Sequence, residues 1–195
     1  MVSIKTTQQQ LKRLNKGSPC QLSMVAHSRK YFTGLISGPA GTPYEGGIYR
    51  LFFDIPKDFP DSPPKVRFTT KVWHPNIDSE TGAICLKQFT WTRPKSGPPI
   101  YTLRVVMKCL RDLLSAPEPD DPVDAFVASQ YKENRRMFES TAQYWAHKFA
   151  DAPRFAFHDD FVKKIVGLGF SETQAVKSLS KCNFILKAAI DDLCW

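Results

Sequence analysis

The sequence has few of the features that mark secreted, membrane-spanning or zinc-stabilised proteins. Its first residues contain no apolar signal core, and no apolar run approaches the length that spans a bilayer. There is no Cys-x-x-Cys pair and no histidine cluster, and the five cysteines are an odd number, so we expect neither a disulfide framework nor a metal site. Reduced thiols suit the cytosol, so we expect a soluble intracellular protein of the cytoplasm that can also occur in the nucleus.

What the chain does contain is typical of a folded globular protein. Its 195 residues are 42% apolar and 24% charged, which suits one large domain with or without a small satellite. The formal net charge of +8 comes from scattered basic residues, and no motif that binds a nucleic-acid groove accompanies them. We therefore expect the charge to serve docking on an acidic protein partner, with no nucleic-acid and no membrane partner.

One stretch combines a rigid corner with a cysteine. Pro75 fixes its own φ and restricts His74, so Asn76 leaves this HPN corner (residues 74–76) on a stiff backbone with an amide that can donate. Cys85 follows after a short polar loop. A cysteine beside a fixed amide donor supplies two parts of an acyl-transfer site, a nucleophile and an oxyanion stabiliser. On these residues alone, a buried cysteine after a turn is the commoner interpretation.

The first 152 residues predict strands followed by helices. Apolar alternation between turn residues predicts strands over about 22–26, 31–36, 48–55 and 66–69. Apolar stripes at helical spacing predict helices over about 6–15, 102–114, 123–130 and 134–149. Short links between the strands favour an antiparallel meander, because parallel neighbours need long crossover connections. We expect an α+β domain, a four-stranded antiparallel meander whose apolar face is covered by these helices.

A second unit is expected after a linker at residues 153–157. Residues 158–195, called the tail below, contain three short helical patterns that predict a small three-helix bundle. Ser171 and Gln174 can form a capping box at the start of the second pattern. A bundle this short is near the lower limit for independent folding, so we expect it to lean on the larger domain. The turn at residues 168–170 is equally consistent with core closure and with a binding surface.

Five ordered motifs resemble those of the ubiquitin-conjugating enzymes. They are TPYEGG (residues 42–47), PPKVRF (63–68), HPN (74–76), TGAICL (81–86) and EPDDP (118–122). The resemblance spans residues 3 to about 150 and implies the fold of that family for residues 1–152. The tail resembles a ubiquitin-associated (UBA) domain, and the two-part layout is similar to the C-terminally extended, chain-building members of the family.

The resemblance implies a reaction that uses no cofactor and no metal. Cys85 takes ubiquitin as a thioester from the ubiquitin-activating enzyme and passes it to a lysine amine of a protein substrate or of another ubiquitin. Asn76 either holds the loop beside Cys85 or stabilises the oxyanion. Asp121 orients the incoming lysine and favours its neutral form. Structural support of the site falls to His74, Pro75 and Asp120.

In the tail, the resemblance implies binding of ubiquitin through a small set of residues. They are Leu168, Gly169, Phe170 and Leu193. An alternative for the whole chain is a ubiquitin-binding scaffold with weak catalysis. Family members of that sort lack the cysteine, which is present here, so we favour the enzyme.

Several residues depart from the family's usual pattern. Trp73 occupies a position that is often Tyr, and Lys87 stands where Asp is common, just beyond the cysteine. Asp61 sits where many members present an aromatic side chain to RING-type ubiquitin ligases, and the segment 88–101 is longer than usual. We therefore expect a ligase to dock by a route other than the usual one.

Overall fold

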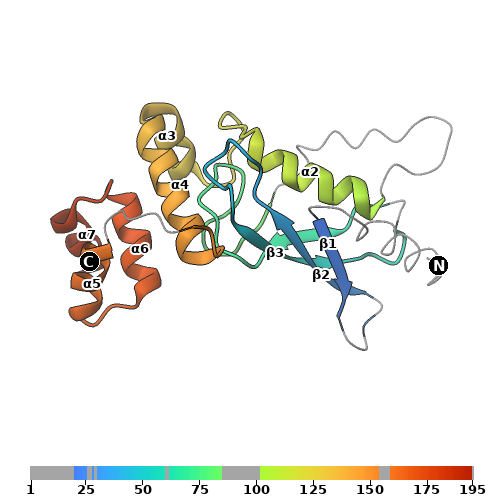
Figure 1. Cartoon of the computed structure of the whole chain (residues 1–195), viewed down its shortest axis with the longest axis horizontal. Helices are drawn as coiled ribbons and strands as arrows, with labels where there is room; N and C mark the ends of the chain where they lie inside the picture. Colours follow the sequence, from blue (N-terminus) through green and yellow to red (C-terminus); the bar gives the residue numbers. More distant parts are fainter. Residues whose placement is uncertain are drawn as a thin grey trace.

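The computed structural model describes residues 20–25, 28, 30–59, 62–84, 102–153 and 159–194 (Figure 1). The helix expected over residues 6–15 and the long segment 88–101 lie outside the described residues. So do Asp61, Cys85 and Lys87, together with residues 154–157 of the expected linker.

Four strands form one antiparallel sheet in the order β1-β2-β3-β4. They are β1 (Cys20–Met24), β2 (Tyr31–Ser37), β3 (Ile48–Asp54) and β4 (Lys65–Phe68). Burial alternates along each strand, with Phe32 and Phe53 paired on the inner face, so the expected meander is confirmed. The first strand begins two residues earlier than expected, because Cys20 pairs with the buried Ile36.

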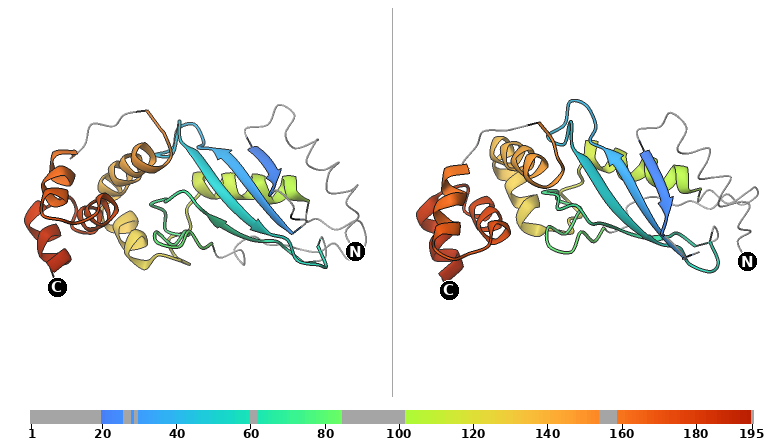
Figure 2. Two further views of the ribbon diagram at one scale, coloured as in Figure 1. Left: turned by 90° about the horizontal axis from the view of Figure 1, so that it is seen from below. Right: turned by 60° about the horizontal axis from the view of Figure 1, so that its bottom comes forward.

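The first described helix, α2 (Leu103–Ser115), crosses the inner face of the sheet (Figures 1 and 2). Its buried stripe contains Leu103, Met107, Leu110 and Leu114, as the helical spacing predicts. The side chain of Thr102 accepts a hydrogen bond from the backbone N–H of Val105 and caps the N-terminus.

Two further helices, α3 (Ala125–Glu133) and α4 (Arg135–Phe149), lie side by side beyond one end of the sheet and not on its face (Figure 2). The reason is that their apolar residues pack on the segment after β4, where the ring of Trp73 lies 4.9 Å from that of Trp145. Asn134 ends α3 and also caps α4, its side chain accepting from Met137 N–H at 3.1 Å. No linker therefore separates the two helices.

The tail forms the expected three-helix bundle of α5 (Asp159–Gly167), α6 (Glu172–Lys181) and α7 (Leu186–Cys194). The capping box is present, because the Ser171 hydroxyl accepts from Gln174 N–H and Gln174 Oε1 accepts from Ser171 N–H. The apolar interior of the bundle includes Val162, Ile165, Val176, Leu179 and Ala189.

The tail docks against α4 of the larger domain (Figure 1). The indole N–H of Trp145 donates to Ser180 Oγ at 2.8 Å, and the ring of Tyr144 contacts that of Phe184 edge-on at 5.6 Å. All four residues are buried, so the contact is packed as a core is packed.

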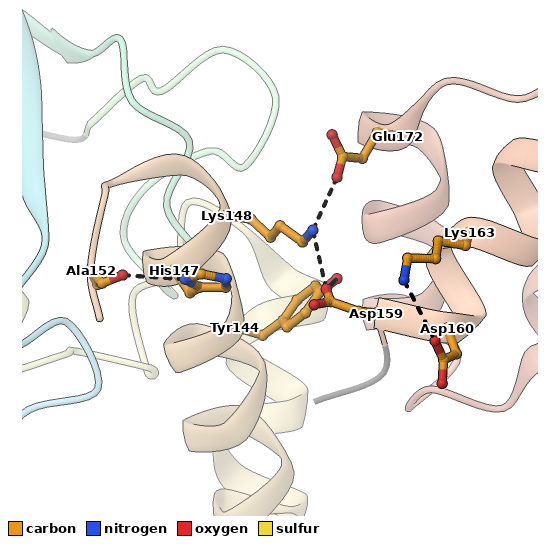
Figure 3. A network of polar contacts seen from close by, with 8 residues as sticks. All are labelled: Tyr144, His147, Lys148, Ala152, Asp159, Asp160, Lys163 and Glu172. Atoms are coloured by element: carbon orange, nitrogen blue, oxygen red, sulfur yellow. Dashed lines mark hydrogen bonds and ion pairs between the residues drawn. The ribbon is translucent and has the colours of Figure 1, made fainter. Parts of the chain in front are cut away.

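A polar network closes the rim of this contact (Figure 3). Lys148 Nζ lies 3.1 Å from an Asp159 oxygen and 3.0 Å from a Glu172 oxygen, and the hydroxyl of Tyr144 donates to Asp159 at 3.2 Å. Burial favours the neutral amine of Lys148, yet its hydrogen bonds to Glu172 and Asp159 outweigh that effect and raise its pKa. The charged lysine thus ties α4 to both α5 and α6.

We predict that Lys148→Met lowers the free energy of unfolding by about 1 kcal/mol, because the partly buried carboxylate of Asp159 and the exposed carboxylate of Glu172 lose their cation. Urea unfolding at low ionic strength measures the loss. The matched control is Lys163→Met, whose ion pair with Asp160 is 3.8 Å long and 79% and 88% exposed at its two side chains. Equal destabilisation by both variants would contradict a role of Lys148 in docking.

Candidate active site

His74 is completely buried at the HPN corner, and both of its ring nitrogens have partners. Nδ1 accepts from the backbone N–H of Asn76 at 3.0 Å, so Nε2 carries the proton and donates to the Leu113 carbonyl at 3.0 Å. Burial lowers the pKa of His74 to about 3, although the Leu113 carbonyl works in the opposite direction. A neutral ring with both nitrogens engaged shapes the corner and offers no base to a reacting group.

The side chain of Asn76 is buried and fully used in holding a loop. Nδ2 donates to the carbonyls of Glu118 at 2.8 Å and Asp121 at 3.1 Å, and Oδ1 accepts from Glu118 N–H at 2.8 Å. An asparagine amide has two N–H donors, so this arrangement leaves none for an oxyanion. The geometry favours the holding role of Asn76 over direct stabilisation of charge.

Pro75 fastens the rest of the same loop, residues 118–124, called the acidic loop below. Its carbonyl accepts from the backbone N–H groups of Val123 at 2.8 Å and Asp124 at 2.9 Å. The carboxylate of Asp124 accepts from the Ser79 hydroxyl at 2.7 Å and caps α3 by accepting from Val127 N–H at 3.2 Å. The corner, the acidic loop and the start of α3 are therefore one hydrogen-bonded unit.

The two neighbouring aspartates of the acidic loop differ in their surroundings. Asp121 is exposed, and its carbonyl is held by Asn76. The side chain of Asp120 is 94% exposed and pairs with Lys132 of α3 at 2.8 Å, a surface ion pair that stabilises the loop only weakly. The structure brings Asp121 to the HPN corner and turns Asp120 toward α3.

The backbone just before Cys85 is held beside the HPN corner by a β-bridge. Ile84, one residue before Cys85, forms an isolated bridge with Ile77, one residue after Asn76. Gly82 has a φ of +72° and lies so close to Phe68 that an added Cβ would be 1.9 Å from its carbonyl oxygen. No larger residue fits there. The backbone that leads to Cys85 is thus fixed beside Asn76, while Cys85 itself lies outside the described residues.

Three further residues support the HPN corner and the acidic loop, and the sequence pattern had not indicated these roles. The hydroxyl of Tyr44 donates to the Trp73 carbonyl at 2.8 Å, Ser79 holds Asp124, and the Gln130 side chain accepts from the Trp73 indole at 2.8 Å. A polar residue on the apolar side of α3 was the available signal for Gln130.

In the tail, the four residues expected to bind ubiquitin differ in exposure. Leu168 is 59% exposed, and Gly169 turns the chain there with a φ of +99°. Phe170 and Leu193 are half-buried and pack against the core of the bundle. The residues that contact α4 come from α5, α6 and the turn after α6, so docking leaves Leu168 open to a partner.

Two classes of feature are absent from the part of the chain that the structure describes. No group of three or more His, Cys, Asp or Glu side chains there could hold a metal ion. No helix there has the length and the apolar character needed to cross a bilayer.

Residues 6–146 match the family model described as "Ubiquitin-conjugating enzyme". The human protein "Ubiquitin-conjugating enzyme E2 K" is 44% identical over 176 residues, covering 88% of this chain and 84% of the human one. "Ubiquitin-conjugating enzyme E2 27" of Arabidopsis thaliana is 42% identical over 164 residues, covering 83% and 81%. A crystal structure of a ubiquitin conjugating enzyme from Plasmodium yoelii superposes with a TM-score of 0.71 at 41% identity, covering 78% of this chain and 98% of that one.

We predict that acid destabilises the chain partly through His74. The pKa of His74 is about 3 in the folded chain, against the ordinary value of 6.5 that applies in the unfolded chain. At a pH between these two values, the unfolded chain therefore binds a proton at His74 that the folded chain does not bind. The stability that neutral His74 contributes is complete above about pH 6.5 and falls toward pH 3 by up to about 1.4 kcal/mol per pH unit.

Urea unfolding between pH 5 and 7.5 measures this effect. Replacing His74 with Gln removes the titrating ring, so the difference in unfolding free energy between wild type and His74→Gln should shrink as the pH falls. A difference that stays constant with pH would show that His74 does not carry the effect.

Proposed function

This chain belongs to the ubiquitin-conjugating enzyme family, whose members transfer ubiquitin through a cysteine thioester, and we propose that Cys85 is the cysteine that carries ubiquitin here. The observation that supports this choice most is the bridge of Ile84 to Ile77, which holds the residue before Cys85 beside the HPN corner. Loading exchanges one thioester for another. The Cys85 thiolate attacks the carbonyl carbon of ubiquitin and a new C–S bond forms. The C–S bond to the activating enzyme breaks, and the cysteine of that enzyme leaves as a thiolate.

Transfer consumes the thioester. A neutral lysine amine attacks the same carbonyl carbon, the C–N bond forms and the C–S bond breaks. The Cys85 sulfur leaves and takes up the proton that the attacking nitrogen loses. We assign to Asp121 the attraction of the lysine ammonium and the acceptance of its proton. Two observations support that role. The Asp121 residue is exposed, so an incoming lysine can reach it. Its backbone carbonyl accepts a hydrogen bond from Asn76, which holds the acidic loop in position. Asn76 then acts by holding the acidic loop.

Thioester formation tests the proposal directly. Wild type mixed with ubiquitin-activating enzyme, ATP and ubiquitin should give a thiol-sensitive adduct on a non-reducing gel, and Cys85→Ala should give none. Absence of the wild-type adduct would instead favour the alternative, a ubiquitin-binding scaffold with weak catalysis.

We predict that Asp121→Asn slows discharge of the loaded thioester to lysine roughly tenfold or more, while loading stays near the wild-type rate. The reason is that only discharge needs a proton acceptor for an amine. The comparison variant is Asp120→Asn at the neighbouring exposed position, which should slow discharge less. Equal slowing of loading and discharge in Asp121→Asn would mean a structural role.

We further propose that the tail is a UBA domain that binds ubiquitin at the turn containing Leu168, and that the chain extends ubiquitin chains. Tail and core would work in the cytoplasm with the activating enzyme, a ligase and protein substrates. The exposure of Leu168 on a docked bundle supports a binding surface, because an apolar side chain held in solvent is available to a partner.

We predict that Leu168→Ala weakens binding of free ubiquitin to the full chain about fivefold, which corresponds to about 1 kcal/mol. Calorimetry or NMR titration measures the Kd. Lys163→Ala, at an exposed position on the neighbouring helix α5, is the control and should bind as wild type does. Unchanged affinity of Leu168→Ala would exclude this turn as the ubiquitin contact.

A further inference from the structure

One buried amide joins the tail to the candidate active site. The Gln130 side chain on α3 is part of a residue only 5% exposed. Its Oε1 accepts from the Trp73 indole at 2.8 Å, and its Nε2 donates to Asn183 Oδ1 at 3.0 Å and to the Ser180 carbonyl at 3.3 Å. Because an indole can only donate, Oε1 must face Trp73, and the Nε2 donors must therefore face the two acceptors of the tail.

Trp73 directly precedes the HPN corner and is held from several sides. Its backbone carbonyl accepts from Tyr44, and its ring packs against Trp145. The tail orients the hydrogen bonds of both packed indoles. The Trp145 N–H donates to Ser180 Oγ. The Trp73 N–H donates to the Gln130 amide, which is oriented by Ser180 and Asn183. Removing the tail would take away the acceptor of the Trp145 indole and the groups that orient the acceptor of the Trp73 indole.

The helix α3 connects the two ends of this arrangement. At its start, Asp124 is bonded to Pro75 and to Ser79. Gln130 lies six residues later, roughly 9 Å along the helix axis. A single helix is thus fixed at one end by the HPN corner and near the other by the docked tail.

A second contact reaches the segment between the HPN corner and Cys85. Lys177 of α6 forms an ion pair with Glu80, and the Lys177 side chain is only 24% exposed. The tail therefore touches the surroundings of the candidate site at two separate points, through Gln130 and through Glu80.

We propose that Gln130 is a positioning residue for the transfer of ubiquitin to lysine. Through it the docked tail fixes α3 and Trp73, and with them the acidic loop that carries Asp121. This contribution of the tail to transfer is separate from the binding of ubiquitin proposed at Leu168. This inference rests on the proposed function of Cys85, because transfer is measured from its thioester.

Discharge of the preloaded thioester to free lysine tests the proposal, because that reaction involves no second ubiquitin for the tail to bind. Asn183→Gly removes one of the two acceptors of Gln130 Nε2 in the full chain and leaves the Ser180 carbonyl. Glycine readily adopts the φ of +49° found at this position. Asn183→Asp retains an acceptor oxygen. Gln130→Met removes the links to both Trp73 and the tail, and Ser129→Ala, at the neighbouring position on α3, is the matched control.

We expect Asn183→Gly to lower the maximal discharge rate roughly threefold and Gln130→Met roughly tenfold, since small displacements of positioned groups cost rate. The lysine concentration at half-maximal rate and the rate of loading should stay at wild-type values, as should both rates in Ser129→Ala. Asn183→Asp should recover most of the loss caused by the glycine variant.

A spectroscopic measurement accompanies the kinetics. The chain has four tryptophans, so its NMR spectrum has at most four indole N–H signals, and Trp73→Phe assigns the one of interest. Asn183→Gly should shift the Trp73 signal and speed its hydrogen exchange.

Wild-type discharge and an unmoved Trp73 signal in Asn183→Gly would overturn the inference while leaving the proposed function intact. A wild type that forms no thioester would overturn the proposed function, and this inference with it.

Discussion

The arrangement depends on the hydrogen bonds between the HPN corner and the acidic loop. They join segments that lie 42 and 45 residues apart in the chain, and they satisfy the buried amide of Asn76 completely. A buried amide without partners would cost about 1–3 kcal/mol, so the corner and the loop are stable only together. The same corner follows Trp73 and precedes Ile77, whose bridge with Ile84 holds the backbone that leads to Cys85.

The tail is also held by hydrogen bonds to buried polar groups. Its docking surface is not only apolar, since Ser180 and Asn183 supply acceptors to donors buried in the larger domain. Fully satisfied polar networks specify one arrangement of the packed elements, whereas apolar contacts alone allow several. The ion pairs of Lys148 at the rim add to that specificity. The tail of this ubiquitin-conjugating enzyme family member is therefore packed as a part of the larger domain and not as a tethered module.

Local patterns were enough to predict the meander, the stripe of α2 and the capping box at Ser171, because each depends on residues close in the chain. The sequence pattern placed α3 and α4 on the apolar face of the sheet, and that placement was wrong. Their position depends on Trp73 packing against Trp145 across a long stretch of sequence. A polar residue on the apolar side of α3 indicates that Gln130 is buried, but it does not identify the partners of the side chain. Those three partners come from segments that only the folded chain brings together. For Asn76, only the structure supplies the partners of the amide, and those partners favour the holding role.

The shared cap at Asn134 has a consequence for how this chain can change. Because α4 begins where α3 ends, the rotation of one helix relative to the other is set by residue count alone. One residue inserted after Asn134 would turn α4 by about 100°, given 3.6 residues per turn. Tyr144, Trp145 and Lys148 would then face away from the tail, although every one of them would still be present. Substitutions are tolerated in such a junction far more readily than a change in its length.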